Sequence, residues 1–158
     1  MTDLQNTVQR LMESFDDEIN TIESLVQKQR ELAEKQEEKV RETAFALLPL
    51  MEKIKDEQHY FIGNETDYRS TRGPILKHDK NENMLYIFSV QKQQPISLNL
   101  YDQEEKPLSY RKLLEAVEFP LIMKGLLITL THLENLKKRY QENNEELDAE
   151  LERFKNYY

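Results

Sequence analysis

The chain of 158 residues contains no cysteine and three glycines. Without cysteine it has no disulfide, no thiolate metal ligand and no cysteine nucleophile. The three glycines are too far apart for the phosphate-binding patterns GxxxxGK[ST] and GxGxxG, and the nucleophile pattern GxSxG is also absent. A chain without cysteine is compatible with a reducing compartment, and we expect a cytoplasmic location.

Long apolar runs are lacking too. The most apolar stretch, residues 121–133, has 13 residues and contains Lys124 and His132, whereas a membrane-spanning helix needs about 20 apolar residues. The first 18 residues are acidic and amphipathic, without the basic and apolar regions of a signal peptide. We therefore expect no membrane partner.

Residues suited to metal binding or catalysis do not form a recognisable pattern. The three histidines, His59, His78 and His132, stand alone, without HxxxH or HExxH spacing. The acidic triplet at residues 16–18 cannot form a cage on a helix, because successive residues point in different directions. The sequence predicts no catalytic residue, no metal site and no cofactor, and a protein that is not an enzyme.

What the chain does contain is charge. Charged residues make up 33% of the sequence, apolar residues 38%, and the net charge is −8. This composition favours long helices with much exposed surface over a large globular core. Residues 1–57 carry 14 acidic and eight basic groups, which argues against broad binding to a phosphate backbone.

The last third of the chain has an apolar stripe with alternating spacings of four and three residues. Polar Lys137 and Asn144 interrupt it, and it ends at Tyr158. This heptad spacing is typical of a coiled coil, whose narrow stripe must be covered by another helix. The candidate oligomer seam consists of Leu126, Leu130, Leu133, Tyr140, Leu147, Leu151 and Phe154.

Residues 1–57 are predicted to form a long N-terminal helix, bent near Pro49. Thr2 and Gln5 have the spacing of a capping box. Between residues 4 and 26 the apolar positions follow spacings closer to an 11-residue repeat than to a heptad, which favours a straighter stripe. These positions are Leu4, Val8, Leu11, Phe15, Ile19, Ile22 and Val26.

Residues 58–107 change to strand-like patterns. The ranges 75–78, 84–90 and 96–100 are β-branched, aromatic or alternating, and polar turns separate them. They predict a three-stranded antiparallel meander, to which residues 60–62 or 68–71 add a possible fourth strand. A sheet this small needs a helix against one face.

Residues 108–158 are predicted to form the C-terminal helix, with Ser109 as N-cap and a bend near Pro120. The predicted fold is α+β and mainly α. Two long helices form an antiparallel coiled-coil-like stalk, and a small β-meander is inserted between them. The three segments are expected to form one structural unit.

A basic segment stands out from the acidic background. It consists of Tyr68, Arg69, Arg72, Lys77, His78 and Lys80. On a hairpin these side chains are a candidate site for an anion or an acidic partner. The alternative is that they balance the acidic helices through salt bridges, and the sequence favours this second interpretation.

These features favour a non-enzymatic, oligomeric coiled-coil protein, most simply a homodimer, that acts as an adaptor in protein binding or assembly. The order helix, β-hairpin, helix is comparable in layout, though not in motifs, to that of prefoldin subunits, and a prefoldin-like holdase chaperone is an alternative. A second alternative is a nucleic-acid accessory protein that uses residues 69–80.

Overall fold

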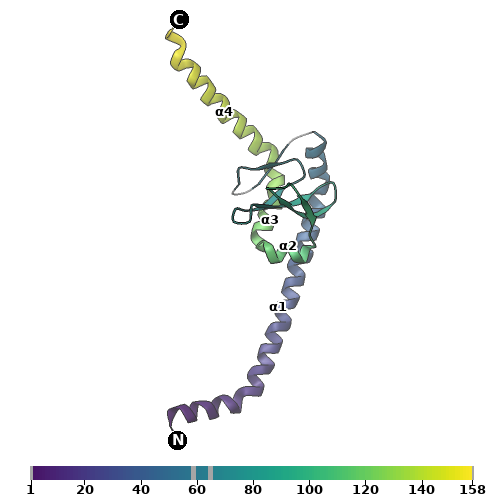
Figure 1. The fold of residues 1–158 in the computed structure, drawn as a ribbon, viewed down its shortest axis with the longest axis vertical. Coiled ribbons are helices and arrows are strands. Elements are labelled where there is room, and N and C mark those ends of the chain that lie inside the picture. The colour runs from purple at the N-terminus through teal and green to yellow at the C-terminus, as the bar shows by residue number, and fades with distance from the viewer. Residues whose placement is uncertain (1, 58–59, 64–65, 158) are drawn as a thin grey trace. The chain divides into compact units, whose positions relative to one another are not determined.

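The computed structural model describes residues 2–57, 60–63 and 66–157 (Figure 1). Its class is α+β, mainly helical, with a small antiparallel meander between helices, as predicted. The predictions made for His59, Asn64 and Tyr158 lie outside the described residues. The chain divides into two compact units, Met1–Lys39 and Val40–Tyr158.

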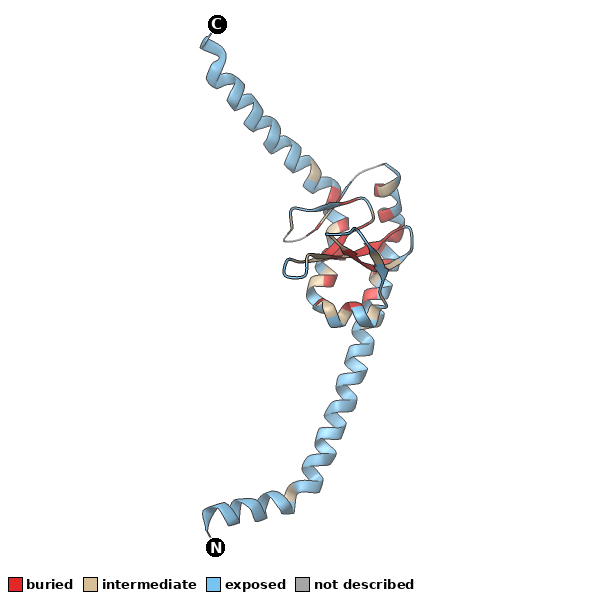
Figure 2. Cartoon of the chain, viewed as in Figure 1, coloured by how far each residue is buried: buried red, intermediate tan, exposed pale blue. Residues whose placement is uncertain are grey.

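The first element is helix α1, Asp3–Asp56. The predicted capping box is present, since the Thr2 amide donates to Gln5 Oε1 at 2.9 Å and the Gln5 amide donates to Thr2 Oγ1 at 3.2 Å. Pro49 lies inside the helix, which continues beyond it. In the first unit this helix is almost entirely exposed, whereas from Val40 onwards it contributes buried side chains to the second unit (Figure 2).

The meander has four strands in chain order: β3 (Ile75–Asp79), β4 (Met84–Ser89), β5 (Gln94–Asn99) and β6 (Glu105–Pro107). The three predicted strands are confirmed. The fourth strand comes from residues for which no strand was predicted. Strands β1 (Phe61–Ile62) and β2 (Arg69–Ser70), considered as additions to the meander, instead pair with each other as a separate hairpin.

The segment 108–158, predicted as one bent helix, is divided into shorter ones. They are α2 (Tyr110–Ala116), α3 (Phe119–Leu127), the 3₁₀ turn η1 (Ile128–Thr131), α4 (His132–Phe154) and the 3₁₀ turn η2 (Lys155–Tyr157). Ser109 is the N-cap of α2, as predicted, and its side chain accepts from the Lys112 amide at 3.1 Å. Pro120 lies in the first turn of α3, a position where its missing N–H costs no hydrogen bond, so it starts a helix instead of bending one.

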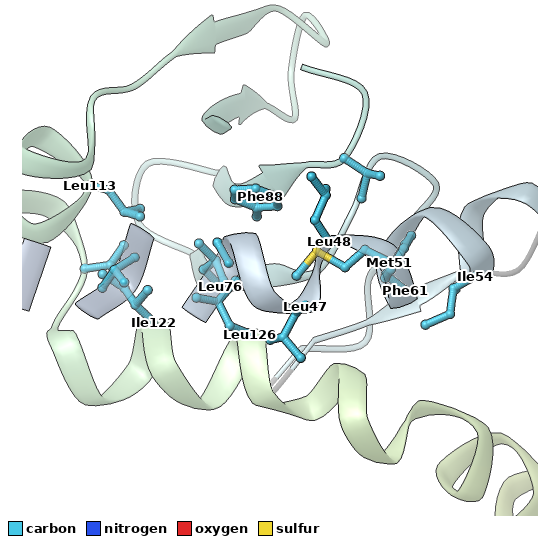
Figure 3. Close-up of a cluster of buried hydrophobic side chains, with 14 residues drawn as sticks. Leu47, Leu48, Met51, Ile54, Phe61, Leu76, Phe88, Leu113, Ile122 and Leu126 are labelled. Carbon is cyan, nitrogen blue, oxygen red and sulfur yellow. The ribbon is translucent and has the colours of Figure 1, made fainter. Parts of the chain in front are cut away.

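The core of the second unit lies between the sheet and the helices (Figure 3). Leu47, Leu48 and Met51 of α1 pack there with Leu76 and Phe88 of the sheet. The same cluster includes Leu113 of α2, its C-cap residue Val117, and Ile122 and Leu126 of α3. A second buried cluster consists of Ile75, Leu85, Ile87, Ile96 and Leu98. Residues 85 and 87 of β4 belong to it while residue 88 belongs to the first cluster, because alternate strand residues face opposite sides of the sheet.

Gly125 allows α3 to pack closely against β3. A Cβ atom placed at this residue would lie 3.0 Å from the Cα atom of Leu76 and 3.1 Å from the carbonyl oxygen of Ile75. The helix therefore approaches the strand more closely than a larger residue permits.

Candidate functional site

The heptad stripe on α4 is exposed within the single chain. Leu133 keeps 56% of its surface exposed, Leu147 57% and Leu151 73%. Leu130, Tyr140 and Phe154 are exposed as well. Exposed apolar side chains in a row along one helix face are typical of a surface that binds another helix.

Leu126 does not belong to this stripe. It lies in α3, is completely buried and packs in the core cluster. The change of structure at η1 separates it from the exposed positions that follow. The candidate seam therefore starts at Leu130 instead of Leu126.

Two shallow apolar depressions lie along α4. Leu133, Leu136 and Tyr140 contribute to the first, and Leu147, Leu151 and Phe154 contribute to the second. Near the end of the helix, the Phe154 ring contacts the Tyr157 ring, 5.5 Å away between centroids, and the Arg153 guanidinium, 5.2 Å from the ring centre. Depressions between apolar side chains one helical turn apart are the holes into which a facing helix inserts its side chains.

The first unit carries its own exposed stripe. The seven apolar positions of the predicted stripe, from Leu4 to Val26, are all exposed. Met12 and Leu25 add exposed apolar surface to the same part of α1. Each unit therefore presents an apolar helix face.

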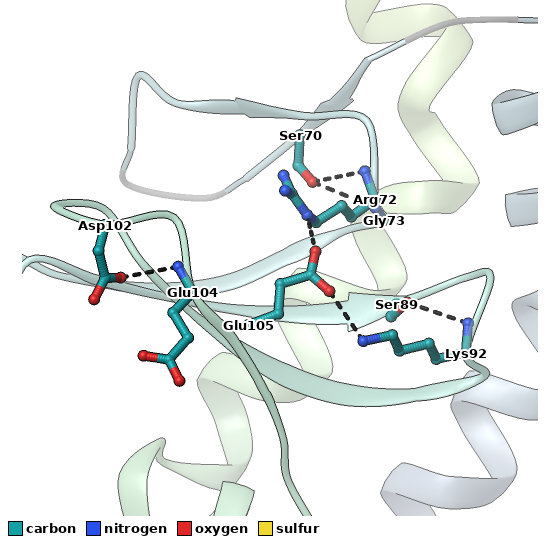
Figure 4. A network of polar contacts seen from close by, with 8 residues as sticks. All are labelled: Ser70, Arg72, Gly73, Ser89, Lys92, Asp102, Glu104 and Glu105. Atoms are coloured by element: carbon teal, nitrogen blue, oxygen red, sulfur yellow. Dashed lines mark hydrogen bonds and ion pairs between the residues drawn. The ribbon is translucent and has the colours of Figure 1, made fainter.

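The basic segment, in contrast, is dispersed by the fold. Arg72 and Lys92 both bind the carboxylate of Glu105 in β6 (Figure 4), and the Lys92 Nζ lies 3.0 Å from its Oε2. Hydrogen bonds from Arg72 and Lys92 lower the pKa of Glu105, with Arg72 as the larger cause. Arg72 is thus neutralised within the chain.

Two further members of the basic segment have structural contacts. Lys77 Nζ donates to the carbonyl oxygen of Ala116 at 3.3 Å, at the last residue of α2, where a cation is favourable because the helix dipole is negative there. The ring of Tyr68 stands edge-on to His78 with centroids 4.8 Å apart. Arg69 and Lys80 are exposed.

The two histidines that the structure describes contact neighbouring side chains. His132 is buried and its ring lies 6.0 Å from that of Phe61, and His78 Nδ1 lies 3.3 Å from Thr66 Oγ1. Among the described residues no group of three His, Cys, Asp or Glu side chains is placed to hold a metal ion.

Two half-buried tyrosines show the other resolved shifts in pKa. Burial raises the pKa of Tyr110, whose ring lies under the guanidinium of Arg41 at 5.0 Å. Burial, together with the charges of Glu82 and Asp79, raises the pKa of Tyr86. Both phenols therefore stay neutral near pH 7 and serve packing.

In the part of the chain that the structure describes, no helix combines the length and the apolar character that crossing a membrane requires. Comparison of the chain with models of protein families, with curated proteins and with solved structures finds no match.

Proposed function

We propose that this protein is a non-enzymatic assembly or adaptor protein that self-associates through its exposed helical stripes. The carrying observation is the run of exposed apolar side chains on η1 and α4, from Leu130 to Phe154. Burying one such side chain contributes about 2 kcal/mol. The six seam positions that α4 and η1 present can therefore exceed the free-energy cost of bringing two chains together, about 4–15 kcal/mol.

Two arrangements can cover the stripes. In the first, the α1 stripe of one copy and the α4 stripe of a second copy cover each other as an antiparallel stalk. In the other arrangement the α4 stripe meets the same stripe of a second copy around a two-fold axis. Both bury the same side chains on α4.

The test is the mass of the full chain in sedimentation equilibrium at tens of micromolar. The wild-type chain is expected to associate. The double variant Leu147→Glu/Leu151→Glu is expected to have the mass of one chain, 19.0 kDa, because two carboxylates would be placed in the apolar seam.

The matched control is Ala149→Glu/Asn156→Glu. It adds the same charge to exposed positions on the opposite side of the heptad, and its association should equal that of the wild type. A wild-type chain that is monomeric at these concentrations would contradict the proposal.

A prefoldin-like holdase is the second candidate. Such a chaperone needs apolar side chains at the ends of its helices, and Leu4, Val8, Phe154 and Tyr157 are exposed there. The test is aggregation of a denatured client protein at equal molar amounts. Suppression that is lost on Leu4→Ser/Val8→Ser would support the holdase, and an unchanged rate of aggregation would reject it.

The nucleic-acid alternative has less support. It needs the cations of residues 69–80 to be available to phosphates, and Arg72 and Lys77 bind groups of the chain itself.

A further inference from the structure

A groove between the β1–β2 hairpin and α4 combines cationic, phenolic and apolar side chains. Its volume is about 250 Å³. The lining residues are Tyr60, Ile62, Arg69, Leu136, Arg139, Tyr140 and Asn143. All belong to the second unit, so the groove is complete within one chain. Tyr140 also belongs to the seam, so self-association and a ligand in the groove would compete for its ring.

One wall of the groove is the outer face of the hairpin. Phe61 and Ser70 are directly opposite each other and buried, whereas Ile62 and Arg69 form the next pair in the register. Because successive strand residues point to opposite faces, this pair faces away from the core, towards the groove.

The other wall is one face of α4. Leu136, Arg139, Tyr140 and Asn143 have the spacing i, i+3, i+4, i+7, which places them on one side of a helix. The contact between the buried rings of Phe61 and His132 fixes the hairpin to the start of α4. The two walls are thus joined by a packed contact and not by exposed side chains alone.

The polar groups of the groove are suited to an anion. Two guanidiniums, two phenol hydroxyls and one carboxamide can all donate hydrogen bonds. No acidic side chain of the described residues lines the groove. Among those same residues, neither Arg69 nor Arg139 has an ion-pair partner, although the chain as a whole carries a charge of −8.

The number of donors distinguishes between kinds of anion. A single carboxylate is satisfied by one arginine in a bidentate pair. Two arginines with additional donors match a phosphate monoester, which carries close to two charges and three strong acceptor oxygens. The rings of Tyr60 and Tyr140, with Ile62 and Leu136, supply apolar walls for a flat group attached to that phosphate.

We propose that this groove binds a phosphate monoester carried on a flat ring or ring-bearing group. Its volume lies below the usual range of small-molecule sites, about 300–1,000 Å³, which suits a bound group as small as one phosphorylated side chain or a mononucleotide. Arg69 and Arg139 hold the phosphate oxygens, and the tyrosine rings hold the carrier.

The experiment titrates the ¹⁵N-labelled full chain with phenyl phosphate in amide correlation spectra. Saturable shifts are expected at the amides of residues 60–62, 69 and 136–143. The affinity should fall at least tenfold in Arg69→Ala and in Arg139→Ala, and at least partly recover in Arg69→Lys. Benzoate, which presents one carboxylate, should bind at least tenfold more weakly than phenyl phosphate.

Arg111→Ala is the matched control, because Arg111 is an exposed arginine on α2 outside the groove. The affinity of this variant for phenyl phosphate should equal that of the wild type. Competition by a phosphotyrosine peptide or by AMP identifies the natural source as a protein side chain or a nucleotide. The proposal is overturned if shifts do not saturate, if they survive in Arg69→Ala/Arg139→Ala, or if inorganic phosphate binds as tightly as phenyl phosphate.

Discussion

Glu105 joins two cations that are distant in the sequence. Its carboxylate accepts hydrogen bonds from Arg72, 33 residues earlier, and from Lys92, 13 residues earlier. The network ties the segment before β3 and the turn after β4 to the edge strand β6. The Glu105 side chain keeps 25% of its surface exposed. Water therefore weakens the two ion pairs, and their contribution to the stability of the fold is modest.

The Glu105→Gln variant should be less stable than the wild type by about 1 kcal/mol at pH 7, measured by urea unfolding. Because the folded pKa of Glu105 lies below its ordinary value of about 4.3, the stabilisation is fully present above that value. It is lost as the pH falls from about 4.3 through the lower folded pKa. The difference between wild type and variant should therefore shrink over this acidic range.

Glu104→Gln is the control for this prediction. The Glu104 carboxylate is exposed and makes no contact with Arg72 or Lys92 (Figure 4). The stability of the Glu104→Gln variant should therefore stay within about 0.5 kcal/mol of the wild type at every pH. Equal losses in the two variants would show that the network does not stabilise the fold.

At Gly73 the addition of a single methyl group should strongly destabilise the folded chain. A Cβ atom there would lie 1.8 Å from the carbonyl oxygen of Phe88, and this neighbour belongs to the backbone of β4. Gly73→Ala should therefore destabilise the chain by about 3 kcal/mol or more, measured by thermal unfolding. Thr71→Ala changes an exposed residue two positions away, and a similar loss there would contradict this explanation.

At this scale the sequence identified the basic segment and favoured salt bridges for it, but it did not identify the partner of each side chain. The six residues are neighbours in the sequence, but closeness in the sequence does not determine what each side chain contacts in the fold. The fold instead pairs Arg72 with Glu105 and places Lys77 at the end of α2. Such contacts depend on how strands and helices meet, which no local pattern contains. The groove residues Arg139 and Asn143 were missed for the same reason, although their spacing from Leu136 and Tyr140 is a helical one.

At the scale of elements, the turns of the meander hold backbone conformations that most residues avoid. Asn83, Gln93 and Gln103 have φ values of 54°, 55° and 62°. Asparagine tolerates this left-handed region better than glutamine, which has no special preference for it. The turn between β4 and β5 therefore stores strain at Gln93.

The Gln93→Gly variant should stabilise the chain by about 0.5–1 kcal/mol, because glycine adopts a positive φ without strain. Urea unfolding measures the gain. Gln91→Gly is the matched control in the same turn. It lacks the positive φ, so glycine there should be neutral or destabilising. A gain of equal size in both variants would mean that relief of strain is not its source.

The elements that the sequence predicted well are those with strong local signals. The capping box at Thr2, the N-cap at Ser109 and the apolar strands were all identified. Strand β6 was missed because Glu105 and Lys106 are polar and Pro107 follows them. Charged residues and proline are, however, compatible with a strand at the edge of a sheet. The bend predicted near Pro120 was wrong. Proline bends a helix when it lies in the helix interior, but Pro120 lies in the first turn of α3, where proline is compatible with the start of a helix.

For the whole molecule, the buried hydrophobic residues of the described chain lie between Val40 and Leu126. The first unit adds none of them. A chain of residues 40–158 should therefore unfold cooperatively, with a midpoint within a few degrees of the full chain, measured by circular dichroism. Loss of cooperative unfolding in this shorter chain would mean that the first unit stabilises the core after all.

The same shorter chain also decides between the two arrangements proposed for the stripes. The stripe on α1 follows a pattern near 11 residues, which corresponds to about 3.67 residues per turn, whereas the stripe on α4 follows the heptad at 3.5. Helices with different periods drift out of register over several turns, and identical stripes do not. The α4 stripe should therefore meet its own copy, and residues 40–158 should associate as tightly as the full chain in sedimentation equilibrium. If the shorter chain is monomeric while the full chain associates, α1 covers α4, and the antiparallel stalk is the arrangement that the molecule adopts.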